Sequence, residues 1–173
     1  MTIVDSIRKE YRVYKTLGER SIAQLSDAQL VEPGPNGANS IAIICCHISG
    51  NLKSRFSNFM TTDGEKEWRN REEEFAARSV TREALLVKWE DGWSVLLTAL
   101  DGLTDDDLKR VVTIRTQPLE VHEALHRSLA HTSHHVGQIV YLAHALRGSA
   151  WTYLSIPPGQ STAFNEKLKA PRP

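Results

Sequence analysis

Four long segments of the chain carry apolar side chains at intervals of three and four residues. They cover approximately residues 2–30, 40–60, 81–101 and 119–147. This spacing places the apolar side chains on one face of an α-helix, whereas no alternation typical of a β-strand extends beyond a few residues. Helices that each bury one dominant face pack against one another. We therefore predict an all-α fold, a four-helix bundle.

The segments between and after these helices differ in character. Residues 61–79 form a long connection between the second and third helices that is polar except for Trp68 and Phe75. Connections of this length are uncommon in compact domains and are often functional. We predict that this connection is ordered and that its run 72–74 of three glutamates is a solvated face. The C-terminal tail is expected to pack on the bundle through Trp151, Tyr153, Leu154 and Ile156.

Composition predicts a single soluble domain over residues 1–173, with 40% hydrophobic and 24% charged residues. A chain of this length buries a core without disulfides or a structural metal, so a metal site would need a functional explanation. Lysine plus arginine equals aspartate plus glutamate, 21 each, which argues against a nucleic-acid partner. The N-terminus lacks a signal-peptide pattern, and the longest apolar run, 41–46, is too short to span a bilayer. We expect a cytoplasmic protein without membrane contact.

Two adjacent cysteines, Cys45 and Cys46, are the only ones in the chain. Neighbouring positions are poorly arranged for a disulfide, and on a helix their side chains diverge by about 100°. They therefore cannot both line one site. We interpret them as small core residues.

Seven histidines stand out, and five of them lie between His122 and His135. On a helical wheel, His131 and His135 lie about 40° apart at the margin of the apolar face, with Gln138 on the same side. This pair has the i, i+4 spacing that lets two imidazoles on one helix bind one ion, although a histidine-rich helix also produces such pairs by chance. The other histidines of this helix are expected on the surface or in packing: His122, His126, His134 and His144.

The second helix supplies a third candidate ligand. His47 occupies the same marginal position on its own wheel, and packing of the two apolar faces would bring it to the histidine pair. A lone histidine there is more often a hydrogen-bonded core residue, but polar neighbours such as Asn51 and Gln138 are costly to bury unless they line a hydrated cleft. Three imidazoles without a fourth protein ligand describe an open site, typical of catalytic zinc.

Two stretches carry a family resemblance: NSIAIICCHISGNLKSRFSNFMTTDGEKEWRNR at 39–71 and HTSHHVGQIVYL at 131–142. They resemble the DinB-like superfamily, also described as DinB/YfiT-like metalloenzymes, and within it the group named domain of unknown function 1572. The resemblance covers nearly the whole chain. It implies a four-helix bundle, often a homodimer, in which His47, His131 and His135 bind a divalent metal, zinc or nickel. Relatives in the superfamily include thiol S-transferases that use bacillithiol or mycothiol and a maleylpyruvate isomerase that uses mycothiol.

Two functions remain open at this point. The first is a metal-dependent enzyme in which the ion activates a small thiol, as in an S-transferase, or water, as in a hydrolase. Its small-molecule substrate could contact Asn51, Arg55, Trp68, Arg69 and Gln138. Arg69 and Arg71 could also bind a carboxylate or phosphate in a forked geometry. No carboxylate near the three histidines stands out as a general base, so no catalytic residue is assigned.

The alternative function is a non-catalytic bundle that binds metal or, as a dimer, a ligand. A stripe of small residues on the fourth helix would permit close approach of another helix, within the monomer or across a dimer: Ala130, Ser133 and Gly137. A protein without metal would exclude the first function, because such an enzyme needs the ion. A bound metal whose removal changes no activity would favour the second.

Overall fold

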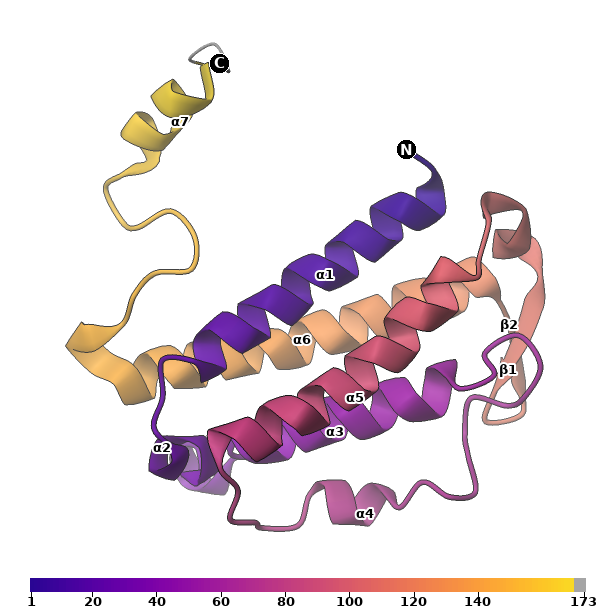
Figure 1. The fold of residues 1–173 in the computed structure, drawn as a ribbon, viewed down its shortest axis with the longest axis horizontal. Helices are drawn as coiled ribbons and strands as arrows, with labels where there is room; N and C mark the ends of the chain where they lie inside the picture. The colour runs from indigo at the N-terminus through magenta and orange to yellow at the C-terminus, as the bar shows by residue number, and fades with distance from the viewer. Residues whose placement is uncertain (170–173) are drawn as a thin grey trace.

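The computed structural model describes residues 1–169 and consists mainly of four long helices (Figure 1). They are α1 (Ile3–Ile22), α3 (Ile41–Phe56), α5 (Arg82–Asp101) and α6 (Val121–Arg147). The shorter helices are α2 (Asp27–Val31), α4 (Arg71–Glu74) and α7 (Ser161–Lys169), and the 3₁₀ turns are η1 (Pro35–Gly37), η2 (Asp105–Lys109) and η3 (Gly148–Ala150). An antiparallel hairpin of β1 (Val111–Ile114) and β2 (Gln117–Glu120) precedes α6. The predicted all-α bundle is confirmed, and no helix within residues 1–169 is long and apolar enough to cross a bilayer.

Two closely packed helix pairs build the bundle: α3 lies along α5, and α1 lies along α6. The backbones of α3 and α5 meet at Gly92, where a Cβ atom would lie only 2.5 Å from the Ser49 Cα. Trp89 and Trp93 of α5 are fully buried, and the Trp93 ring lies edge-on to Tyr11 of α1 with 6.4 Å between centroids. These aromatic side chains join the two pairs into one core.

Three helix boundaries differ from the prediction, each for a local reason. The first predicted helix is divided into α1 and α2, because Ser26 caps a new helix start and Gln29 completes the capping box. The second ends at Phe56, shortly before Asn58 adopts a positive φ of 49°. The fourth begins at Val121, because Leu119 pairs with Val112 in the hairpin instead of entering the helix.

The tail after α6 contacts the bundle in its first part. Trp151 stacks on His144 with ring centroids 5.2 Å apart, and the Gln24 side chain donates to the Thr152 carbonyl oxygen at 3.0 Å. Helix α7, which follows, has no buried residue and extends away from the four long helices (Figure 1). The expected packing of the tail therefore holds in part: Trp151 and Leu154 are partly buried, whereas Tyr153 and Ile156 are 42% and 37% exposed.

The connection between α3 and α5 is ordered, as predicted, and α4 within it contacts α3. It is also tied to the turn of the hairpin. The Asp63 carboxylate accepts hydrogen bonds from the backbone N–H groups of Arg115 and Thr116, both at 2.8 Å, and the Gly64 N–H donates to the Thr113 carbonyl oxygen at 2.7 Å. These bonds bring the connection and the hairpin together beside α3 and α6, where the candidate site lies.

Candidate metal centre

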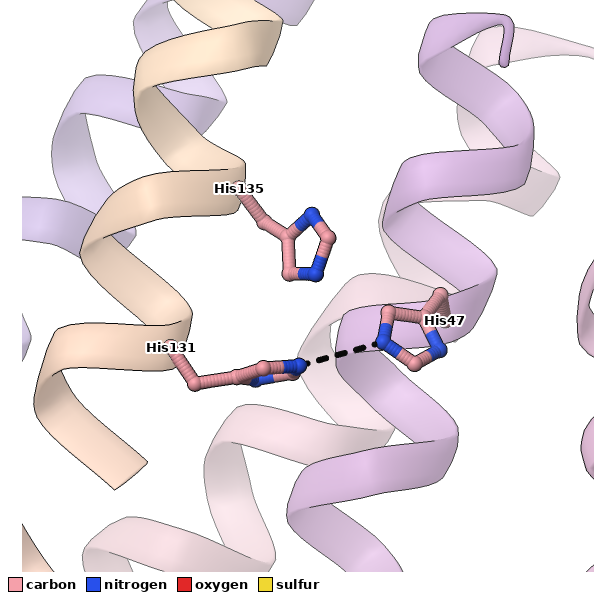
Figure 2. Close-up of side chains that lie close together, drawn as sticks. All are labelled: His47, His131 and His135. Carbon is pink, nitrogen blue, oxygen red and sulfur yellow. Dashed lines mark hydrogen bonds between the residues drawn. The ribbon is translucent and has the colours of Figure 1, made fainter. Parts of the chain in front are cut away.

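Three histidines from two helices meet between α3 and α6 (Figure 2). His47 of α3 is buried, whereas His131 and His135, one turn apart on α6, are half-buried. His47 Nε2 lies 3.2 Å from His131 Nε2, and one ring nitrogen from each of the three residues lies within 4.8 Å of the others. The structure brings together the three residues that the helical wheels singled out.

This spacing suits a divalent metal ion. Zinc binds imidazole nitrogen at about 2.0–2.1 Å in tetrahedral geometry, which separates two ligand nitrogens by about 3.3 Å. The His47–His131 distance is already close to that value, and the His135 ring lies 4.9 Å from the His47 ring and 4.6 Å from the His131 ring, between centroids. Within residues 1–169 no fourth histidine, cysteine or carboxylate joins the group. The donor set therefore fits one ion with an open coordination position.

A buried carboxylate holds His47 in position. Glu74 Oε2 accepts a hydrogen bond from His47 Nδ1 at 2.9 Å, which leaves Nε2 facing the other two imidazoles. The same carboxylate accepts two bonds from Arg69, at 2.7 Å from Nε and 2.9 Å from Nη2, and the Arg69 side chain is only 2% exposed. A histidine that binds metal commonly donates its second N–H to a carboxylate in this way, which fixes its tautomer and orientation.

Gly50 makes room for this carboxylate. A Cβ atom at that position, on the helix turn after His47, would collide with Glu74 Oε1. A side chain there would push the carboxylate away from the His47 ring. The glycine in α3 is therefore required by the close approach of α4.

His135 has its own hydrogen-bond partner on α6. Its Nδ1 lies 2.8 Å from Gln138 Oε1, and the Gln138 amide nitrogen lies 3.3 Å from His134 Nε2. Because the amide oxygen can only accept, His135 Nδ1 carries the proton and Nε2 is left free. Gln138, which the sequence suggested for the substrate pocket, instead orients a candidate ligand.

Burial favours the neutral form of His131 and His135. It lowers the pKa of His131 to about 4, assisted by repulsion from His135, His47 and two arginines. Burial also lowers the pKa of His135, although the hydrogen bond to Gln138 opposes this. Burial alone would raise the pKa of Glu74, but the hydrogen bonds from His47 and Arg69 outweigh it and lower that pKa. At neutral pH His131 and His135 therefore present neutral imidazoles, the form that binds a metal ion.

A cavity of about 390 Å³ opens beside the three histidines. Its walls come from α3, α6, the connection and the hairpin, and they combine aromatic rings with five arginines: Arg55, Arg69, Arg71, Arg115 and Arg127. Its volume falls within the range typical of small-molecule sites. The histidines therefore face a space in which a small molecule can lie.

The structure separates the remaining candidates for the substrate pocket. Asn51, Arg55 and Arg69 line the cavity, but Arg69 and Arg55 are also bound to carboxylates, Glu74 and Glu65. Trp68 does not line it: its side chain is 59% exposed and borders a different hollow on the other side of the connection. Sequence placed Trp68 in a polar segment but gave no direction for its ring.

One interpretation from the sequence was wrong. The run 72–74 was expected to be solvated throughout, but Glu74 is only 8% exposed and contacts a candidate ligand. Nothing in the sequence distinguishes Glu74 from Glu72 and Glu73, which are exposed. Only the position of α4 against α3 selects it.

The two cysteines lie in the core. Cys45 is fully buried and Cys46 nearly so, and burial raises the pKa of both thiols. Cys46 Sγ contacts an Arg78 guanidinium nitrogen at 3.0 Å. Neither cysteine lines the histidine cavity, in agreement with their interpretation as core residues.

Comparison with known proteins gives a family and no activity. No curated protein matches the chain. The model of a protein family of unknown function, DUF1572, matches residues 1–160, a span that contains the three histidines, Glu74 and the whole lining of the cavity. The chain therefore belongs to the DUF1572 family.

Proposed function

We propose that this protein is a divalent-metal-dependent enzyme of the DinB-like superfamily, with His47, His131 and His135 as the metal ligands. The observation that carries the proposal is the convergence of three imidazoles, each able to offer one nitrogen within 4.8 Å of the others, beside a cavity. Zinc and nickel both accept imidazole ligands. With three protein ligands, such an ion keeps a position for a substrate atom.

A divalent ion bound here would lower the pKa of a thiol or water and attract its electron-rich atom. The protein's own residues prepare the place for it. Glu74 and Arg69 hold His47, Gln138 holds His135, and burial favours the neutral form of His131 and His135. The aromatic walls, including Phe56 and Phe75, limit the access of water to a bound molecule.

Of the two reactions, transfer of a small thiol agrees better with the lining of the cavity. Hydrolysis commonly needs a general base near the attacking water, and within residues 1–169 no aspartate or glutamate lines the cavity. A thiol with a lowered pKa needs no such base, because its proton passes to solvent beforehand. The sulfur then bonds to an electrophilic carbon while the bond from that carbon to its leaving group breaks, and the leaving group departs with the electron pair. The proposed substrate is therefore a low-molecular-weight thiol together with a small electrophile.

Elemental analysis of the purified, untagged protein tests the metal site. We expect about one equivalent of divalent metal in the wild type, in line with one three-histidine centre, and loss of that metal in His135→Ala. His126→Ala, an exposed histidine of the same helix, is the matched control and should retain the metal. A wild type that contains no metal, and takes up none on titration, would refute the proposal.

Activity measurements then separate catalysis from simple binding. Glutathione-like and bacillithiol-like thiols are incubated with a model electrophile and the metal-loaded protein, and thiol consumption is followed. Transferase activity that disappears in His135→Ala supports the proposal. If metal binds but neither thiol transfer nor hydrolysis depends on it, the non-catalytic metal-binding bundle becomes the better account.

A further inference from the structure

The cavity beside the histidines carries more positive than negative charge. Five arginines line it, whereas within residues 1–169 no aspartate or glutamate does. The whole chain is neutral, with 21 basic and 21 acidic residues, so this excess is a local feature. A ligand bound here experiences a local positive field even though composition indicates none.

Three of these arginines are already engaged by two carboxylates behind the cavity wall. Glu65 Oε2 lies 3.2 Å from Arg55 and 2.7 Å from Arg115. Glu74 is paired with Arg69 at 2.7 Å and also bonds His47. These guanidinium groups shape the wall and hold the connection and the hairpin together, and they are not free to bind a ligand without losing a partner.

Arg71 and Arg127 are the two that remain available. The carboxylate paired with Arg71 is Glu72, at 3.6 Å, and the two side chains are 50% and 88% exposed, so this pair is weak. Arg71 also lies over the Phe75 ring, 4.8 Å from its centroid, which fixes its direction. Among residues 1–169 no carboxylate forms an ion pair with Arg127.

We propose that Arg71 and Arg127 bind an oxyanionic group of the substrate, while the reactive end of the substrate lies at the three histidines. This inference rests on the proposed function and names its substrate class: a small molecule that carries a carboxylate or a similar oxyanion. Guanidinium groups suit it because their paired N–H donors match two oxygens of one anion.

Isothermal titration calorimetry with two thiols tests the proposal. The probes are 3-mercaptopropionate and 3-mercaptopropanol, which have equal chain length and differ in the terminal carboxylate or hydroxyl. We expect the zinc-loaded wild type to bind the acid about tenfold more tightly than the alcohol, a ratio equal to about 1.4 kcal/mol. In Arg71→Gln/Arg127→Gln, which changes two exposed side chains, the ratio should fall to about threefold or less. Arg12→Gln, an exposed arginine of α1, should keep the wild-type ratio.

Two results would overturn the oxyanion site. The first is equal affinity of the wild type for both thiols. The second is a preference for the acid that survives in the double variant, which would mean that the ion or other arginines recognise the carboxylate. The same titrations on metal-free protein distinguish failure of the oxyanion site from failure of the proposed metal-dependent function. If no zinc binds, the proposed enzyme is refuted. In that case a preference for the acid that depends on Arg71 and Arg127 would still support the oxyanion site, and the lack of such a preference would overturn the oxyanion site.

Discussion

Glu74→Gln is the substitution that most directly tests how the protein supports its metal centre. The change keeps the size of the side chain and a carbonyl oxygen that can accept from His47, but it removes the charge that binds both His47 and Arg69. Loss of such a supporting carboxylate typically weakens metal affinity about 10–100-fold. We expect zinc affinity to fall by this factor, equal to about 1.4–2.7 kcal/mol.

The same substitution should also destabilise the metal-free fold. The Arg69 side chain is 2% exposed and bound by Glu74 through two nitrogens, and removal of one partner of a buried pair costs about 3–5 kcal/mol. Two features reduce this cost: glutamine still offers an acceptor, and Glu65 remains 4.0 Å from Arg69. We therefore expect the free energy of unfolding to fall by about 2–3 kcal/mol.

A double variant separates the two effects. In Glu74→Gln/Arg69→Met the buried cation is absent, so the free energy of unfolding should recover in part, while zinc affinity stays low. Urea unfolding of the metal-free proteins measures the first quantity, and competition with a chromophoric zinc chelator at neutral pH measures the second. Glu73→Gln, at an exposed position of the same short helix, is the matched control. If Glu74→Gln binds zinc as tightly as Glu73→Gln, the proposed support of His47 is refuted.

Three further predictions follow from the same geometry. Gly50→Ala should lower zinc affinity without touching a ligand, because its Cβ collides with Glu74, whereas Gly137→Ala, with nothing within 4 Å, should leave the zinc titration unchanged. Gln138→Ala removes the acceptor of one ligand imidazole and should weaken zinc binding about tenfold in the same competition assay. The free energy of unfolding of the metal-free protein, measured in urea, should fall as pH falls from about 6.5 toward 4. The native pKa of His131 is about 4, so the unfolded chain binds the proton at a higher pH than the folded chain does. His131→Asn should flatten this pH dependence.

The helices were predictable because their apolar spacing repeats along the chain. In α5 apolar residues of the repeat such as Trp89 and Trp93 are fully buried, whereas Glu83 and Glu90 are exposed. The boundaries failed where a local interaction competes with helical periodicity. Leu119 belongs to the hairpin because Arg115 and Thr116 adopt positive φ and reverse the chain there. The apolar spacing of the sequence does not predict that turn.

The metal centre could be predicted only as far as periodicity reaches. A wheel assigns a direction to every side chain of a regular helix, and it therefore brought His47 together with His131 and His135 across two helices. The supporting carboxylate lies in the irregular connection, where no repeat assigns directions. Glu74 points inward and Trp68 points outward. Both side-chain directions depend on how the connection that contains α4 packs against α3, and this tertiary contact cannot be read from a sequence repeat.

The position of the site follows from how the helices pair. The closest packing joins α3 to α5 and α1 to α6, so the boundary between α3 and α6 is where the two pairs meet. It carries polar side chains and a cavity instead of a continuous apolar contact. An ion held by His47 from one pair and by His131 and His135 from the other would cross-link the two pairs at this boundary. Because only the folded chain brings these histidines together, metal binding should stabilise the fold, and the increase in melting temperature with zinc should be lost in His135→Ala and kept in His126→Ala.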